Sequence, residues 1–320
     1  MKLLVIGGSV FLGRAYVEEA LARGHDVTTF NRGSSNPDLY GGDVEKLQGD
    51  RQTDLSALEG RSWDAVIDTC GYEPDVVGRS VSLLRKAVGH YAFISSVSVY
   101  ADRLRSAVDE SSTLKSDQSQ DDDGGYGRRK VECERVVDAA FGDRALILRP
   151  GIIVGPHEDV GRLPYWLTAS ATSDPVVAPA PADRTIQLID ARDIAAFGLG
   201  HAELERGGLF NVTAPEGDQS FRDLVTACLD VTGSDADVAW VDDARLAAAD
   251  VEMWTELPLW APVEYAGTWA VDVTRAQEAG LTCRALERTV ADTWEWLRDV
   301  PDYRPRFPWL SPEKAARLMA

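Results

Sequence analysis

The chain has 320 residues, of which 44% are hydrophobic and 27% are charged, a composition typical of a globular protein with one large or two modest domains. Its net charge of −19 opposes contact with phosphate backbones and anionic lipid, so we expect neither nucleic acid nor a membrane surface as a partner. The four cysteines are scattered and form no Cys-x-x-Cys pair, which predicts no metal site and no disulfide framework and favours a reducing, cytoplasmic location.

The opening stretch, MKLLVIGGSVFLG, predicts a strand, a tight turn and a helix. The apolar run Leu3–Ile6 is broken by Gly7-Gly8-Ser9, whereas a signal peptide needs about 7–15 apolar residues and a membrane span about 20. A buried strand over Leu3–Ile6 fits better. Apolar residues then recur at helical spacing from Phe11 to Leu21, and Gly24 lies where a helix would end.

Strands and helices alternate from this unit to Pro150. Strands are predicted at Val27–Phe30, Lys46–Gly49, Ala65–Asp68, Tyr91–Ser95 and Ala145–Leu148, and helices at Asp54–Leu58, Val76–Val88 and Tyr126–Ala140. This alternation predicts a parallel sheet covered on both faces. The stretch Asp102–Gly125 is polar, and we expect its Asp121–Asp123 run to be a solvated run or a mobile loop and not to bind metal, since no histidine or spaced carboxylate accompanies it.

The composition changes after Pro150. Prolines cluster at Pro175, Pro179 and Pro181, and eight of the nine tryptophans lie beyond this point. We expect a dinucleotide-binding domain in residues 1–150 and a smaller, irregular C-terminal substrate lobe in residues 151–185 and 214–320. Residues 186–213 are expected to return to the first domain, where Gln187–Asp190 and Leu209–Val212 are predicted to extend the main sheet.

The glycines after the first strand are typical of a nucleotide site. Gly7 and Gly8 permit a tight turn, and Gly13 lets the helix pack closely on the sheet, so that backbone N–H groups at the helix start face a pyrophosphate. Val10 occupies the place of the middle glycine, which we expect to crowd the turn. The glycines alone are consistent with an ordinary turn, but the strand before and the helix after them favour a cofactor.

The end of the second strand, Phe30-Asn31-Arg32, bears on which cofactor is bound. An acidic residue at this place binds the ribose 2′-OH of NAD, whereas an arginine accommodates the 2′-phosphate of NADP. Because Asn31 and Arg32 stand here, NADP is favoured over NAD; the alternative is that Arg32 only stacks on adenine or is a solvated charge. Asp50 and Arg51, after the third strand, are expected to meet the adenine ring.

A tyrosine and a lysine four residues apart predict a proton-transfer site. Tyr126 and Lys130 are the only such pair in the chain, and on a helix they share a face. A lysine cation there would lower the phenol pKa from about 10, which would make Tyr126 a proton donor or acceptor. Ser96, at the end of the strand Tyr91–Ser95, is the candidate for holding the substrate oxygen. Ser95 and Ser98 are weaker candidates, and the alternative for the pair is a helix face without chemistry.

These residues resemble the extended short-chain dehydrogenase/reductases, the NAD(P)-dependent epimerase/dehydratase group, over nearly the whole chain. The matching segments are Gly7–Gly13, Ser95–Tyr100, Tyr126 with Lys130, Leu148–Gly151, Val154–Pro156, Ile189–Asp193 and Phe210–Val212. The resemblance implies a Rossmann-type doubly wound sheet, a Ser96–Tyr126–Lys130 catalytic set and a homodimer.

The motifs and the resemblance together give a set of site candidates. Those for the cofactor are Gly7, Ser9, Phe11, Leu12, Gly13, Asn31, Arg32, Asp50, Arg51, Cys70, Ser95, Tyr126, Lys130 and Pro150. For the substrate, Arg184 is a candidate to hold a diphosphate and His157 to face the pocket.

The predicted function is hydride transfer to or from a hydroxyl or carbonyl of a small-molecule sugar or nucleotide-sugar-like substrate. Val97 and Ser98 stand where dehydratases of the group often carry an acidic pair, which leaves epimerisation or reduction. The alternative is a non-catalytic dinucleotide-binding or RNA-binding relative, against which the complete catalytic set and the negative charge both argue. An α/β-hydrolase is excluded because Ser9 lacks the second glycine of G-x-S-x-G.

Overall fold

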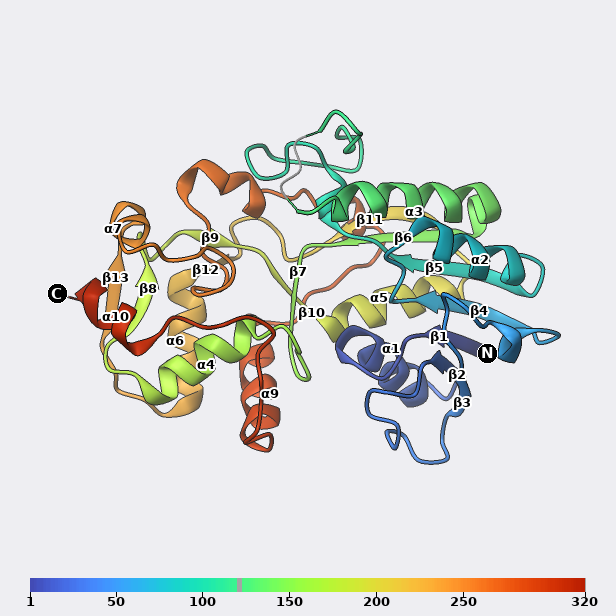
Figure 1. Cartoon of the computed structure of the whole chain (residues 1–320), viewed down its shortest axis with the longest axis horizontal. Coiled ribbons are helices and arrows are strands. Elements are labelled where there is room, and N and C mark those ends of the chain that lie inside the picture. Colours follow the sequence, from blue (N-terminus) through green and yellow to red (C-terminus); the bar gives the residue numbers. More distant parts are fainter. Residues whose placement is uncertain (120–122, 320) are drawn as a thin grey trace.

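The computed structural model describes residues 1–119 and 123–319, and within them a parallel sheet of seven strands forms the centre of the molecule (Figure 1). The strands run in the order β11-β6-β5-β4-β1-β2-β3. They are β1 (Lys2–Ile6), β2 (Asp26–Asn31), β3 (Glu45–Gln48), β4 (Trp63–Asp68), β5 (Val88–Ile94), β6 (Ala145–Pro150) and β11 (Gly208–Val212). The order reverses between β1 and β4, and ligands bind at such a reversal, outside the carboxyl ends of the strands. The predicted Rossmann-type sheet is confirmed.

Helices cover both faces of this sheet. On one face α1 (Phe11–Ala22) packs against α5 (Ala191–Glu203), and on the other α2 (Pro74–Leu84) packs against α3 (Tyr126–Phe141). Within β1 alone, Leu3 and Val5 join the core beneath α1, whereas Leu4 and Ile6 join the core beneath α2 and α3. Because both faces of this strand are buried, successive side chains are all apolar, and the first strand is therefore an unbroken apolar run in the sequence.

One of the two strands expected to extend the sheet does so, and the other does not. Leu209–Val212 lies in β11, which pairs with β6 as predicted. In contrast, β10 (Leu188–Asp190) pairs with β7 (Ile152–Val154), so the prediction for Gln187–Asp190 was wrong.

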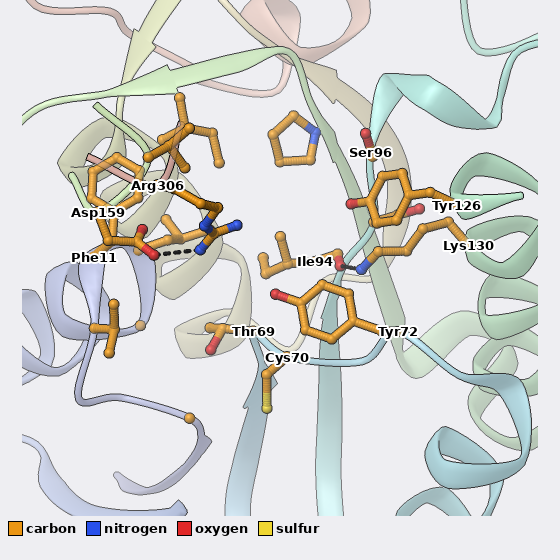
Figure 2. Close-up of a pocket in the computed structure, with 18 of the residues that line it drawn as sticks. Phe11, Thr69, Cys70, Tyr72, Ile94, Ser96, Tyr126, Lys130, Asp159 and Arg306 are labelled. Carbon is orange, nitrogen blue, oxygen red and sulfur yellow. Dashed lines mark hydrogen bonds and ion pairs between the residues drawn. The ribbon is translucent and has the colours of Figure 1, made fainter. Parts of the chain in front are cut away.

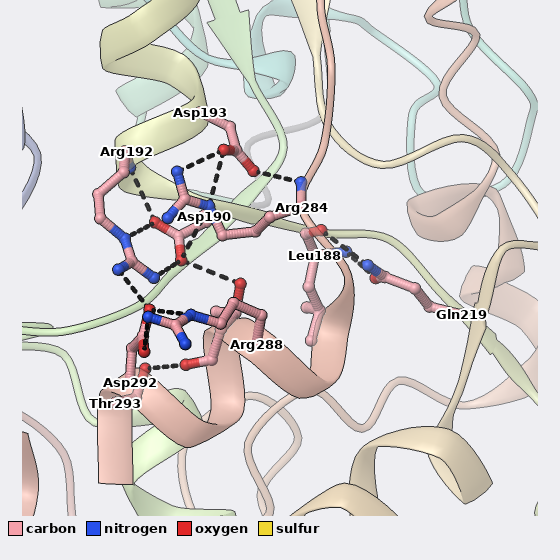
Figure 3. A network of polar contacts seen from close by, with 10 residues as sticks. Leu188, Asp190, Arg192, Asp193, Gln219, Arg284, Arg288, Asp292 and Thr293 are labelled. Atoms are coloured by element: carbon pink, nitrogen blue, oxygen red, sulfur yellow. Dashed lines mark hydrogen bonds and ion pairs between the residues drawn. The ribbon is translucent and has the colours of Figure 1, made fainter. Parts of the chain in front are cut away.

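The reason lies in Asp190, which ends β10 and caps α5 by accepting the Arg192 N–H at 2.8 Å. Its carboxylate also accepts the Thr289 hydroxyl at 2.9 Å, so the strand is fixed to α9 (Leu286–Arg298). Figure 3 shows this network, in which Arg192, Arg284 and Arg288 join Asp190, Asp193 and Asp292.

The second lobe lies beside the sheet, at the end occupied by the C-terminus in Figure 1. Its core contains the fully buried Trp166 and Trp260, so part of the tryptophan excess in this half serves packing. The elements of this lobe are β8 (Val176–Pro179), β9 (Thr185–Ile186), β12 (Gln219–Ser220), β13 (Val238–Val241), α4 (Arg162–Thr172), α6 (Phe221–Thr232), α7 (Asp243–Ala248) and α10 (Pro312–Met319). In contrast, α8 (Thr274–Glu278) packs against β11, and Ala276 joins the core beneath α1. Single 3₁₀ turns occur at Ser56–Leu58, Val97–Val99 and Gly142–Arg144, with a longer one at Val263–Trp269.

Among the helices of residues 1–119 and 123–319, none is both long and apolar enough to cross a membrane.

Candidate functional site

A cavity of about 1100 Å³ opens at the carboxyl ends of the central strands, between the sheet and the second lobe. The glycine turn, the ends of β2, β4 and β5, the start of α3 and several residues of the second lobe form its walls. The structure places on it every residue that we named for the cofactor or for catalysis: Gly7, Ser9, Phe11, Leu12, Gly13, Asn31, Arg32, Asp50, Arg51, Cys70, Ser95, Ser96, Tyr126, Lys130 and Pro150.

The glycine turn has a shape that only glycine can adopt. Gly7 has a φ of +109°, and a Cβ added there would lie 2.4 Å from the Thr69 hydroxyl; at Gly13 it would lie 2.6 Å from the Gly8 amide nitrogen. No side chain caps the start of α1, where Val10 is the N-cap residue and is 38% exposed. Backbone N–H groups at an uncapped helix start bind anionic groups, so the turn fits the pyrophosphate of a dinucleotide.

The loop after β2 braces this turn. The Asn31 amide donates to the Gly7 carbonyl at 3.3 Å, and its oxygen accepts the Gly33 N–H at 2.8 Å. The Tyr40 hydroxyl donates to the Gly8 carbonyl at 2.7 Å. Asn31 therefore holds the turn in place, which the sequence did not indicate, while Arg32 beside it is exposed at the rim of the cavity.

Arg51 forms an ion pair that was not expected. Its guanidinium donates to both oxygens of the Asp68 carboxylate, at 2.6 and 2.5 Å, and to the Ser80 hydroxyl at 2.9 Å. Asp68 is fully buried and also accepts the Tyr91 hydroxyl at 2.8 Å. Arg51 lines the cavity while its donors are used inside the protein, and its expected contact with the adenine ring stays a prediction.

Ser96, Tyr126 and Lys130 lie together on the wall opposite the glycine turn (Figure 2). Ser96 follows the end of β5, and its hydroxyl accepts the Ser98 N–H at 3.1 Å. Tyr126 begins α3, and Lys130 lies one turn later on the same face, as its spacing predicted. The Lys130 ammonium donates to the carbonyl oxygens of Gly71 and Ile94, each at 2.7 Å, and so joins the loop that follows β4 to the last residue of β5.

The start of α3 is fixed by Asp123. One oxygen of its carboxylate accepts the Gly127 N–H at 3.0 Å and the Lys115 ammonium at 2.9 Å. The Lys115 side chain is only 1% exposed. The expectation that the Asp121–Asp123 run is solvated is therefore corrected at Asp123, whereas residues 121 and 122 lie outside the described part of the chain.

Burial controls the titration of the tyrosine and the lysine. It raises the pKa of Tyr126 to about 12, an effect reinforced by Tyr72 and opposed by a hydrogen bond with Ser96 and by the charge of Arg162. Burial lowers the pKa of Lys130 to about 8, against the opposing attraction of Asp68. We predicted that Lys130 would lower the phenol pKa; in the protein alone the desolvation of Tyr126 outweighs any such effect, because the phenolate would lose its hydration.

Several residues of the cavity were not predicted. The Tyr72 ring lies 5.0 Å from the Lys130 ammonium, and Figure 2 shows its hydroxyl directed into the cavity. From the second lobe come Arg162 and an ion pair of 2.5 Å between Arg306 and Asp159. These residues lie on three separate loops or helix ends, and no local spacing in the sequence joins them.

The two residues expected to bind substrate lie away from this cavity, which corrects both predictions. Arg184 forms an ion pair of 2.8 Å with Asp243 and donates to the Ala261 carbonyl at 2.7 Å, so it stabilises the second lobe internally. His157 lines a separate hollow of about 390 Å³ and lies edge-on to Trp296. Burial lowers the His157 pKa to about 4, so it is neutral at physiological pH.

Sequence comparison agrees with the geometry. The model of the NAD dependent epimerase/dehydratase family matches residues 79–212, which include Ser96, Tyr126 and Lys130. The predicted resemblance to the epimerase/dehydratase family is confirmed over this part of the chain. A curated protein similar to this chain is the chloroplast stem-loop binding protein of 41 kDa b from Arabidopsis thaliana, which is 26% identical over 251 residues, or 72% of this chain. The chain spans 63% of the length of that protein.

Solved structures of epimerases share the fold. The UDP-glucuronic acid 4-epimerase from Bacillus cereus, in complex with NAD, superposes with a TM-score of 0.67 at 16% identity, covering 95% of this chain and all of that one. The UDP-N-acetylglucosamine 4-epimerase from Methanobrevibacter ruminantium M1 gives a TM-score of 0.68 at 18% identity, covering 93% and 98% of the two chains. At these identities the likeness establishes the fold alone.

Proposed function

We propose that this epimerase/dehydratase relative is an NAD(P)-dependent oxidoreductase or epimerase acting on a hydroxyl or carbonyl of a sugar or nucleotide-sugar-like substrate. The observation that carries the proposal is that Ser96, Tyr126 and Lys130 share one cavity with a glycine turn fitted to a dinucleotide. The sheet side of the cavity would hold the cofactor, and the second lobe, residues 151–185 and 214–320, would hold the substrate.

Each of the three residues has a role that follows from its surroundings. Tyr126 would transfer the proton, and because its pKa is about 12 it stands protonated at neutral pH and ready to donate to a carbonyl. Ser96, which lines the same cavity as Tyr126, would hold the same substrate oxygen. Lys130 would fix the backbone at Gly71 and Ile94 around them. A bound nicotinamide would supply or accept the hydride, and its cationic oxidised form would favour the ionised phenol.

The choice of cofactor is part of the proposal. Arg32 is exposed at the rim of the cavity, next to the exposed Ser34 and Ser35. Asn31 stands in place of the acidic residue that would accept a hydrogen bond from the ribose 2′-OH of NAD. This arrangement supports NADP over NAD. The family resemblance further supports a homodimer, which sedimentation of the purified chain would measure.

A second candidate function, RNA binding by a non-catalytic relative of the same fold, is favoured by the likeness to the stem-loop binding protein of Arabidopsis thaliana. The charge of −19 opposes it, because RNA binding depends on cationic contacts with phosphates. Titration of a fluorescent stem-loop at low salt separates the two functions, since submicromolar binding would favour the second.

The proposed function is tested by titrating the protein with NADPH and NADH, read by nicotinamide fluorescence, and by comparing Tyr126→Phe with wild type. We expect cofactor binding in both proteins and turnover in the wild type alone. Tyr265→Phe is a matched control, because Tyr265 does not line the cavity. Failure of the protein to bind either cofactor, or full turnover by Tyr126→Phe, would contradict the proposal.

A further inference from the structure

Arg162 is a cation of the second lobe whose position is firmly fixed on the catalytic cavity. It is the first residue of α4 and lines the cavity together with Ser96 and Tyr126. The Glu158 carboxylate accepts the Arg162 N–H at 2.7 Å and the Leu163 N–H at 3.1 Å. The backbone from which the Arg162 side chain projects is therefore anchored at the start of a helix.

The positive charge of Arg162 is poorly compensated by the protein. Its ion pair with Glu158 is 4.0 Å long, and both oxygens of that carboxylate already accept backbone N–H groups. Burial raises the pKa of Glu158 to about 7, so at neutral pH this group carries only part of a negative charge. In contrast, Arg184 and Arg284 each lie within 2.8 Å of an aspartate oxygen. Arg162 thus retains donors and charge for another anion.

The charge of Arg162 acts where the chemistry is expected. Arg162 and Tyr126 line the same cavity, and although burial raises the pKa of the phenol, the charge of Arg162 lowers it. A guanidinium binds a carboxylate through two parallel hydrogen bonds, and such a pair fixes orientation as well as position. The negative field of the whole chain repels acids, so an acidic substrate needs a local cation of this kind.

We propose that Arg162 binds a carboxylate on the sugar ring of the substrate, next to the hydroxyl or carbonyl on which Tyr126 and Ser96 act. The proposal rests on the proposed function and narrows its substrate class to sugar acids or their nucleotide derivatives. The anion could instead be the diphosphate of a nucleotide sugar. In a uronic acid the diphosphate is attached to carbon 1 and the carboxylate is carbon 6, so a sugar that lacks only the carboxylate tells the two anions apart.

The test uses a matched pair of probes, UDP-glucuronate and UDP-glucose, which share the diphosphate and differ only at carbon 6. Calorimetric titration of the cofactor-loaded protein is expected to show UDP-glucuronate binding about tenfold or more tightly. Arg162→Gln should remove that preference, and Arg162→Lys should retain part of it. Arg306→Gln is the matched control: it removes another cavity arginine, and we expect the preference for the acid to survive.

Other outcomes overturn the proposal. Equal binding of the two sugars by the wild type would show that no carboxylate is recognised. If Arg162→Gln has a wild-type thermal unfolding curve but binds both sugars more weakly by the same factor, Arg162 contacts the diphosphate. Absence of binding by either probe would also reject the substrate class. The proposed function would still stand in any of these cases if the protein binds nicotinamide cofactor and Tyr126→Phe abolishes turnover of another substrate.

Discussion

Gly127 packs against the backbone of Ser98 so closely that a Cβ on Gly127 would lie 2.0 Å from the Ser98 carbonyl oxygen. Gly127 directly follows Tyr126 in α3, and Ser98 belongs to the turn that follows Ser96. The absence of a side chain at residue 127 therefore sets how near the phenol can come to the serine. Backbone atoms cannot move aside as a flexible side chain can, so this distance is fixed by the glycine.

We expect Gly127→Ala to separate Tyr126 from Ser96. Overpacking of this kind costs about 1–3 kcal/mol, and the helix must shift away from the turn after β5, so turnover should fall by at least about tenfold. Gly200→Ala is the matched control, because a Cβ at that helical glycine meets nothing within 4 Å and alanine favours helix by about 1 kcal/mol. Urea unfolding and turnover of both variants measure the effect. Unchanged turnover in Gly127→Ala would show that the helix position is not critical.

Asp123 gives a second prediction about the position of Tyr126. Asp123→Ala removes the acceptor of the Gly127 N–H and leaves Lys115 buried without this ion pair, a change that typically costs about 3–5 kcal/mol. Asp123→Asn keeps an oxygen for the Gly127 N–H. We therefore expect kcat to be highest in the wild type, lower in Asp123→Asn and lowest in Asp123→Ala, with cofactor affinity nearly constant. Equal kcat in the Asn and Ala variants would show that the hydrogen bond to Gly127 does not position Tyr126.

The features that were predicted correctly depend on residues that are close together in the chain. The apolar run of β1, the glycines after it and the helical spacing of Tyr126 and Lys130 are all short-range patterns, and the structure contains each of them. Parallel strands bring their carboxyl ends to one edge, so residues at strand ends could be assigned to one site from chain order alone.

The features that were not predicted depend on contacts between segments far apart in the chain, and no residue spacing in the sequence indicates those contacts. The ion pair of Arg51 was missed, because its partner Asp68 comes from the next strand of the chain and is fully buried. Arg184 was predicted to bind a diphosphate, but it forms an ion pair with Asp243, which lies almost sixty residues later in the chain. The high pKa of Tyr126 was missed for a related reason, since desolvation depends on the whole three-dimensional environment.

Glu158 makes stability depend on pH. Its pKa is about 7 in the folded protein against an ordinary value of 4.5, so the folded state binds more protons than the unfolded state between these values. The free energy of unfolding should therefore fall as pH rises from about 4.5 to 7. Glu158→Gln lacks this titration. Its free energy of unfolding relative to wild type should therefore rise by up to about 3 kcal/mol between pH 5 and pH 8. Urea unfolding at the two pH values measures this gain, and parallel pH profiles would contradict the prediction.

Arg32 is predicted to decide between the two cofactors. Its side chain is exposed at the rim of the cavity, where removal leaves no buried charge behind, so Arg32→Ala should fold normally. A charge-assisted contact with the 2′-phosphate is worth about 1.5–3 kcal/mol, which corresponds to a loss of roughly 10- to 100-fold in NADPH affinity. NADH lacks that phosphate, and its affinity should change little. Fluorescence titration of both cofactors measures the ratio, and Arg61→Ala, which removes an exposed arginine away from the cavity, is the control. If both cofactors weaken equally, Arg32 contacts a part that they share, such as the adenine ring.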